Sequence, residues 1–248
     1  EWDAEKGHIF HPLILIMEGA LLGVFVVLDL FVFYVFWELT LIPMFFLILV
    51  WGGAERRYAS MKFFIYTFTA SVLMYFNTGD ASLAGSLTGH HFDLVSMTAQ
   101  AAGGGLIAGE GLRHFVWILL LIGFATKMPS VPVHTWLPDA HVQAPTAGSM
   151  LLAGVMLKMG AYGFLRGAVT IFPESTVVFT PLLIVLGMVS LVYGAIVCMG
   201  QTNLKRMVAY SSVSHMGLIF LGIATMQPLG IAGALFMMFA HGIISPLL

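Results

Sequence analysis

Long apolar stretches, separated by short polar or glycine-rich segments, make up most of this 248-residue chain. A helix rises 1.5 Å per residue, so about 20 apolar residues are needed to cross a bilayer. By that measure we expect an all-α bundle of about eight membrane-spanning helices. The expected spans are residues 12–29, 31–51, 61–76, 115–129 continuing with a break to 137, 146–172, 176–199, 206–226 and a last span that begins after Pro228.

Residues 77–112 are rich in glycine, serine and alanine and contain no sustained apolar run. We expect a loop here, with room for one short surface helix. His90 and His91 lie in this loop without cysteine or acidic partners at the spacing of metal ligands. They are therefore expected to be solvated loop residues rather than a metal site.

Composition places the chain in the membrane. It is 59% hydrophobic and 9% charged, whereas soluble domains carry about 25% charged residues. No basic run suggests a nucleic-acid partner, and the single cysteine, Cys198, excludes a disulfide within the chain. The charged opening EWDAEKGHIFH is followed by a full-length span, so we expect no cleavable signal peptide. Without an initiator methionine and with an apolar end, residues 1–248 are expected to be one membrane domain, a fragment of a longer protein.

The basic residues of the loops set the orientation. Arg56, Arg57 and Lys62 form a cluster before the third span, and Lys205 and Arg206 lie before the seventh. Cytoplasmic loops carry an excess of such residues. Alternating crossings place both groups on the same side, so the expected number of spans agrees with the charge pattern.

A helix break is expected beside the first of two lysines in apolar segments. Pro129 and Pro132 follow Lys127 closely, and Pro138 comes soon after. Proline removes a backbone donor and interrupts an α-helix. Broken backbone at membrane depth survives when it is buried in protein or lines water. We therefore predict that the helix is interrupted between Lys127 and Leu137.

The two lysines differ in how firmly they point to function. A charge at the centre of a membrane helix costs roughly 2.5–3.5 kcal/mol on insertion scales, so such residues usually line a polar pathway. About a dozen residues, or roughly 18 Å, separate Lys158 from either end of its span, which is too far for its side chain to reach water. Lys127 is more ambiguous, because Pro129 and Pro132 could mark the membrane boundary.

Five titratable residues on separate spans form a candidate proton relay: Glu38, Lys127, Lys158, His215 and His241. We predict that Glu38 approaches Lys127 within ion-pair reach, because an unpaired buried lysine is costly. Histidine exchanges protons near neutral pH. The alternatives are that Glu38 is an interfacial acid beside Trp37 and that each histidine only forms hydrogen bonds within its helix.

No other catalytic motif competes with this relay. The chain contains no glycine-rich phosphate loop, no CxxC pair and no pair of histidines spaced for haem or zinc on one helix. We therefore expect no cofactor and no metal in this chain.

Three stretches closely resemble the antiporter-like M subunit of respiratory complex I. They are FVFYVFWELTLIPMFFLILVWGG, ATKMPSVPVHTWLPDAHVQAPTAGSMLLAGVMLKMGAYGFLR and NLKRMVAYSSVSHMG. The corresponding proteins are the D subunit of plastids and cyanobacteria and subunit 4 of mitochondrial NADH dehydrogenase. A shorter part, HxWLPDAHxxAPTxxS, would also fit subunits of Mrp-type antiporters and membrane-bound hydrogenases.

The resemblance implies a fourteen-helix fold with two inverted five-helix repeats, each containing one broken helix. It also implies roles for Glu38 as the family's acid, for Lys127 and Lys158 as its two lysines, and for His215 and His241 as central-axis histidines. The chain departs from the family pattern because it begins near the fourth helix and stops in the eleventh. The second broken helix and the exit residue expected on it are therefore missing.

The resemblance implies a proton-translocating subunit of NADH:quinone oxidoreductase, coupled to quinone reduction elsewhere in the complex. NADH, FMN, Fe–S clusters and quinone are then expected in partner subunits, and the partners are other membrane subunits, including neighbouring antiporter-like ones, and the lipid bilayer. The expected location is a bacterial inner membrane, with an organellar inner or thylakoid membrane as the alternative. Other readings are a subunit of an Mrp-type Na⁺/H⁺ antiporter or of a membrane-bound hydrogenase; the WELTLIPMFFLI form around Glu38 favours complex I.

Overall fold

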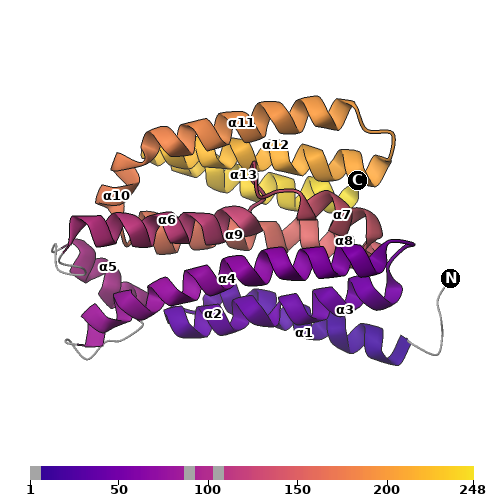
Figure 1. Ribbon diagram of the computed structural model, residues 1–248, viewed down its shortest axis with the longest axis horizontal. Helices are drawn as coiled ribbons and strands as arrows, with labels where there is room; N and C mark the ends of the chain where they lie inside the picture. Colours follow the sequence, from indigo (N-terminus) through magenta and orange to yellow (C-terminus); the bar gives the residue numbers. More distant parts are fainter. Residues whose placement is uncertain (1–6, 87–92, 103–108) are drawn as a thin grey trace.

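The computed structural model describes residues 7–86, 93–102 and 109–248, and these residues form an all-α bundle (Figure 1). His90 and His91, expected to be loop residues, lie outside the described residues. The helices are α1 (Gly7–Val26), α2 (Leu30–Leu39), α3 (Leu41–Trp51), α4 (Arg56–Ser86), α5 (Leu94–Ala102), α6 (Glu110–Lys127), α7 (Trp136–Gln143), α8 (Thr146–Leu151), α9 (Leu157–Gly163), α10 (Pro173–Val178), α11 (Thr180–Met199), α12 (Leu204–Ala224) and α13 (Pro228–Leu247). Two π-helical turns, Leu152–Met156 and Phe164–Val169, flank α9.

Six stretches within the described residues are long and apolar enough to cross a membrane. They are Gly7–Val26, Leu30–Trp51, Thr146–Val169, Thr180–Met199, Leu204–Ala224 and Pro228–Leu247. The other two expected spans correspond to α4 and α6, which have 31 and 18 residues. α6 carries Glu110, Arg113 and Lys127 in those 18 residues, which explains why composition alone does not mark it as a span.

The segment 77–112 is not a single loop. α4 continues to Ser86, well beyond the expected end of the third span at residue 76, and α5 adds nine helical residues. Extending an existing helix costs much less than starting a new one, so α4 can run on through residues that are weak helix formers. α5 is fixed to the turn between α1 and α2, because the amide of Leu94 donates to the carbonyl of Leu28 at 2.8 Å.

The helices form three tiers (Figure 1). The group α1–α4 packs on one side of the tier made by α6–α9, and α11–α13 pack on the other side. Small residues allow α11 and α12 to approach closely, as is common between membrane helices. A Cβ atom on Gly194 would lie 2.6 Å from the amide nitrogen of Ser214, and one on Gly217 would lie 2.6 Å from that of Leu191.

One cluster of buried apolar side chains runs through the three tiers, and the outer helices keep apolar faces on the outside. Only 22% of the apolar window of α11, and the same share of α13, is buried inside the bundle. Exposed apolar faces of this kind suit a lipid environment, where every helix satisfies its own backbone hydrogen bonds.

The expected helix break is present. α6 ends at Lys127 and α7 begins at Trp136, with Pro129 and Pro132 in the turns between them. Pro138 lies in the first turn of α7 rather than in the break, at a place where its missing N–H costs little. The freed backbone groups find partners in the protein: the amide of Val131 donates to Ser190 Oγ at 3.0 Å. The break is therefore held by neighbouring helices.

Candidate functional site

The five candidate residues lie on five helices. Glu38 is in the last turn of α2, Lys127 ends α6, Lys158 is in α9, His215 is in α12 and His241 is in α13. Lys127, Lys158 and His241 are buried, whereas Glu38 and His215 are half-buried. The fold therefore brings charged and titratable groups from all three tiers into the interior.

Lys158 is part of a continuous chain of hydrogen bonds. Its Nζ lies 2.6 Å from His241 Nδ1 and also donates to the carbonyl of Ala153. On the far side of the imidazole, His241 Nε2 lies 3.0 Å from Ser212 Oγ. The hydroxyl of Ser212 donates to the carbonyl of Val208 at 3.1 Å. Since its one proton is used there, Ser212 accepts from Nε2, which leaves Nδ1 free to accept from Lys158.

The local backbone helps to place the ammonium group of Lys158. In the π-helical turn before α9, the amide of Leu157 bonds to the carbonyl of Leu152 instead of that of Ala153. The ammonium group of Lys158 donates to the Ala153 carbonyl. Wide turns of this kind are rare in helices and are often found at functional sites.

His215 extends this group. Its ring lies edge-on to the ring of His241, with 5.3 Å between centroids and 80° between planes. Its Nδ1 is buried and has no hydrogen-bond partner within the described part of the chain. Three titratable side chains from α9, α12 and α13 are thus in contact or adjacent.

Lys127 has a different environment. Among residues 7–86, 93–102 and 109–248, its Nζ has no hydrogen-bond partner, although the side chain is 2% exposed. The ammonium group lies over the ring of Trp37, 5.2 Å from the centroid, and interacts electrostatically with Glu38. The expected ion pair is therefore an interaction across a gap rather than a direct contact. Ser71 and Tyr34 are polar neighbours of the Glu38 carboxylate.

The two lysines lie on helices that touch. α6 and α9 pack together, and a Cβ atom on Gly160 would lie 2.6 Å from the amide nitrogen of Met128 and 2.9 Å from the carbonyl oxygen of Phe124. A larger side chain at this position would push the two helices apart. Lys158 also lines an open groove of about 420 Å³ between α1, α9 and α13.

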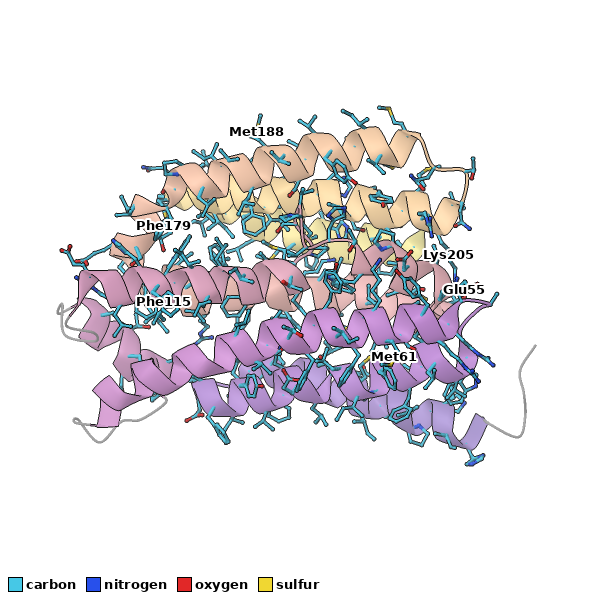
Figure 2. The ribbon with its side chains drawn as sticks, viewed as in Figure 1. Glu55, Met61, Phe115, Phe179, Met188 and Lys205 are labelled. Atoms are coloured by element: carbon cyan, nitrogen blue, oxygen red, sulfur yellow. The ribbon has the colours of Figure 1, made fainter. Side chains whose placement is uncertain are left out.

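Beyond the helix break, Asp139 ties α7 to the neighbouring helices. Its carboxylate accepts from Lys62 at 2.7 Å and from Arg206 at 3.2 Å. Lys205 donates to the carbonyl of Ala144 at 3.1 Å. These residues lie at the end of the bundle where Glu55 and Lys205 are labelled in Figure 2. The basic residues predicted to share one side of the membrane therefore lie at one end.

Two further buried histidines, His134 and His141, have no hydrogen-bond partner for either ring nitrogen within the described residues. His134 lies edge-on to Tyr193, with 5.1 Å between ring centroids. His141 lines a cavity of about 110 Å³ together with Lys205. In the part of the chain that the structure covers, no group of three or more His, Cys, Asp or Glu side chains is placed to hold a metal ion.

Sequence reasoning did not select Trp37, Ser71 or Ser212. Trp37 directly precedes Glu38, and Ser212 precedes His215 by three residues, about one helical turn. Both positions carry a usable signal, because polar or aromatic neighbours of a buried charge are natural partners. Ser71 carries none, since it lies more than 30 residues from the charges it serves.

A family model, NADH:quinone oxidoreductase/Mrp antiporter, TM, matches residues 28–248 of the chain. Among similar curated proteins, the NAD(P)H-quinone oxidoreductase chain 4 3 of Picosynechococcus is 46% identical over 247 residues, which are 98% of this chain and 43% of the relative. The NADH-quinone oxidoreductase subunit M of Rhodobacter capsulatus is 45% identical over 238 residues, 93% of this chain and 46% of the relative. The chain thus spans less than half the length of these relatives.

Solved structures show the same fold. A chain of respiratory complex I from Thermus thermophilus superimposes with a TM-score of 0.88 at 33% identity, over 98% of this chain and 50% of that chain. A chain of the Mrp complex from Dietzia gives a TM-score of 0.83 at 23% identity, over 95% of this chain and 43% of that chain. The second similarity shows the fold alone.

Proposed function

Because this chain belongs to the NADH:quinone oxidoreductase/Mrp antiporter family, we propose that it is a proton-translocating part of a membrane subunit of an NADH:quinone oxidoreductase. The observation that supports this most directly is the hydrogen-bonded chain from Lys158 through His241 to Ser212. It joins two titratable groups on different helices inside a largely apolar bundle.

The geometry supports proton transfer in the following order. The Lys158 ammonium group gives a proton to Nδ1 of His241, which leaves lysine as a neutral amine and the imidazole with protons on both nitrogens. The imidazolium then releases its Nε2 proton past Ser212 to water or a further acceptor, and the imidazole returns to its Nε2–H tautomer, which frees Nδ1 for the next proton. Histidine is suited to this step because either ring nitrogen can carry the proton. The neutral amine is ready to accept the next proton, from the direction of Lys127.

The redox chemistry is assigned to partner subunits. NADH, FMN, Fe–S clusters and quinone would be held there, and the chain would couple to quinone reduction through the complex. The relatives that are 45–46% identical are named quinone oxidoreductases, which favours this assignment over an Mrp-type Na⁺/H⁺ antiporter or a hydrogenase. The chain would lie in a bacterial inner membrane, or in a thylakoid or organellar membrane, beside other antiporter-like subunits. Residues 1–248 would form a single membrane domain within a longer subunit.

The test replaces Lys158 in the full-length protein within its complex. Lys158→Met keeps the length of the side chain and removes its proton site, so we expect assembly and packing to survive while proton transport fails. Lys158→Arg should fail nearly as badly, because arginine stays protonated in proteins. Proton pumping into vesicles is measured beside NADH:quinone activity, which reports that the complex has assembled. An assembled Met variant that pumps at the parent rate would show that Lys158 is structural.

A further inference from the structure

The ammonium group of Lys127 rests on an aromatic face. Nζ lies 5.2 Å from the centroid of the Trp37 ring, within the distance at which a cation is attracted to an aromatic ring. In the described part of the chain, the same nitrogen has no hydrogen-bond partner. Tryptophan provides the strongest such face among the side chains.

The Trp37 ring is fixed in place. The side chain is 1% exposed, and its Nε1 donates to Ser71 Oγ at 3.1 Å. Ser71 in turn donates to the carbonyl of Thr67 at 2.7 Å, so its lone pairs remain available to the indole. The edge of Phe124 packs against the ring, with 5.6 Å between centroids and 81° between planes. A ring held on two sides gives the ammonium group one defined position.

The same contacts connect the ring to Glu38. Ser71, which accepts from the indole, is also a polar neighbour of the Glu38 carboxylate. Glu38 Oε1 is buried and makes no hydrogen bond within residues 7–86, 93–102 and 109–248. Trp37 thus contacts Lys127 with its face and Ser71 with its edge, directly beside Glu38 in the chain.

We propose that Trp37 is a positioning residue that holds the Lys127 ammonium group apart from Glu38, and this rests on the proposed function of Lys127 in proton transfer. A tryptophan face stabilises a cation without taking its proton, because the ring has no acceptor lone pair. A direct salt bridge would instead fix the proton between lysine and carboxylate. The ring thus keeps lysine charged, buried and available to transfer its proton towards Lys158.

The first test compares variants that keep or remove the aromatic face, made in the full-length protein within its complex. Trp37→Leu removes the face, and we expect proton transport per electron to fall about tenfold, which corresponds to about 1.4 kcal/mol. Trp37→Phe keeps a weaker face, and transport should stay within about threefold of the parent.

Trp117 offers a matched control. It is also fully buried, and its indole donates to a hydroxyl, that of Thr176, at 2.9 Å. Trp117→Leu removes as much packing and a similar hydrogen bond, but touches neither lysine. Assembled Trp117→Leu complexes should pump at the parent rate. Equal losses in the two leucine variants would show that position 37 contributes packing alone.

A second test leaves the shape of the ring nearly unchanged. Tryptophan carrying one, two or three fluorine atoms is incorporated at position 37 in place of Trp37, and separately in place of Trp117. Fluorine withdraws electron density from the ring face, so attraction to a cation weakens stepwise. We expect transport to fall stepwise at position 37 and to stay constant at position 117. If the fluorinated proteins fold and assemble normally and transport stays constant across the series at position 37, the proposal is overturned.

Lys127→Met separates this proposal from the proposed function. If that variant assembles and still pumps at the parent rate, Lys127 carries no protons and the proposed function fails at this residue. If Lys127→Met stops pumping, but Trp37→Leu and the fluorinated series leave pumping unchanged, the proposed proton transfer through Lys127 stands. The positioning role of Trp37 is then refuted.

Discussion

The two buried lysines are placed in different ways. Lys158 is hydrogen-bonded to a carbonyl and to a histidine, which is hydrogen-bonded in turn to a serine, and we propose that a proton leaves it by this route. Lys127 has an aromatic face and a carboxylate across a gap, so its charge is stabilised without a hydrogen-bonded route within the described residues. Burial alone therefore does not define the surroundings of a membrane lysine; one of these ammonium groups is held by hydrogen bonds and the other by an aromatic face.

The largest effect is expected at Glu38. Glu38→Gln keeps the shape of the side chain and removes the carboxylate charge that attracts Lys127 within the described residues. Removing one partner of a buried charge pair costs roughly 3–5 kcal/mol, because the other charge stays buried and unpaired. We expect proton pumping per electron to fall by about 100-fold or more. The double variant Glu38→Gln with Lys127→Met should assemble better than the single one but should not pump.

A smaller loss is expected at His241. His241→Gln can still accept a hydrogen bond from Lys158 but cannot carry a proton. General acid–base groups contribute typically 10²–10⁴-fold, and neighbouring His215 offers a partial substitute, so we expect a loss of about 10- to 100-fold. Vesicle pumping measures it, with NADH:quinone activity as the assembly control. Parent-level pumping in this variant would show that the hydrogen bond, and not proton transfer, is the role of His241.

The smallest effect is expected at Ser212. Ser212→Ala removes the acceptor of His241 Nε2 but leaves both titratable groups of the chain in place. One hydrogen bond contributes about 0.5–1.5 kcal/mol, which corresponds to a loss of about 2- to 10-fold. Ser214 is a suitable control, because its hydroxyl donates to the carbonyl of Leu191 and not to the histidines. If Ser212→Ala and Ser214→Ala change pumping equally, the contact with His241 has no special part in transport.

Much of the fold was predictable because the length and apolar content of a segment identify a membrane helix. The six spans and the break after Lys127 follow from those rules and from the backbone chemistry of proline. The length of α4 did not follow, because its continuation to Ser86 runs through residues with weak helix propensity and depends on helix propagation. The composition of segment 77–112 pointed to a loop with room for one short helix; α5 is such a helix, but residues 77–86 belong to α4.

The candidate residues could be selected from the sequence because a charge in an apolar span is conspicuous. Their contacts could not be predicted in the same way. The spacing of Ser212 and Trp37 marks them as neighbours of titratable residues, but it does not show that Ser212 accepts from His241 or that Trp37 turns its face to Lys127. The expected approach of Glu38 to Lys127 was right as an electrostatic interaction but not as a direct contact. Their roles in proton transfer remain predictions.

The wide turn Leu152–Met156 has a consequence for how this chain tolerates insertions and deletions. A π-turn contains one residue more than an α-turn. Deleting one residue there, such as Gly154, would turn the wide turn into a regular α-turn and leave the flanking helical segments on their present faces. The carbonyl of Ala153 would then accept from the backbone amide of Lys158, as in any α-helix, and would be lost to its ammonium group. The one extra residue of this short segment thus leaves a backbone carbonyl available to a buried charge.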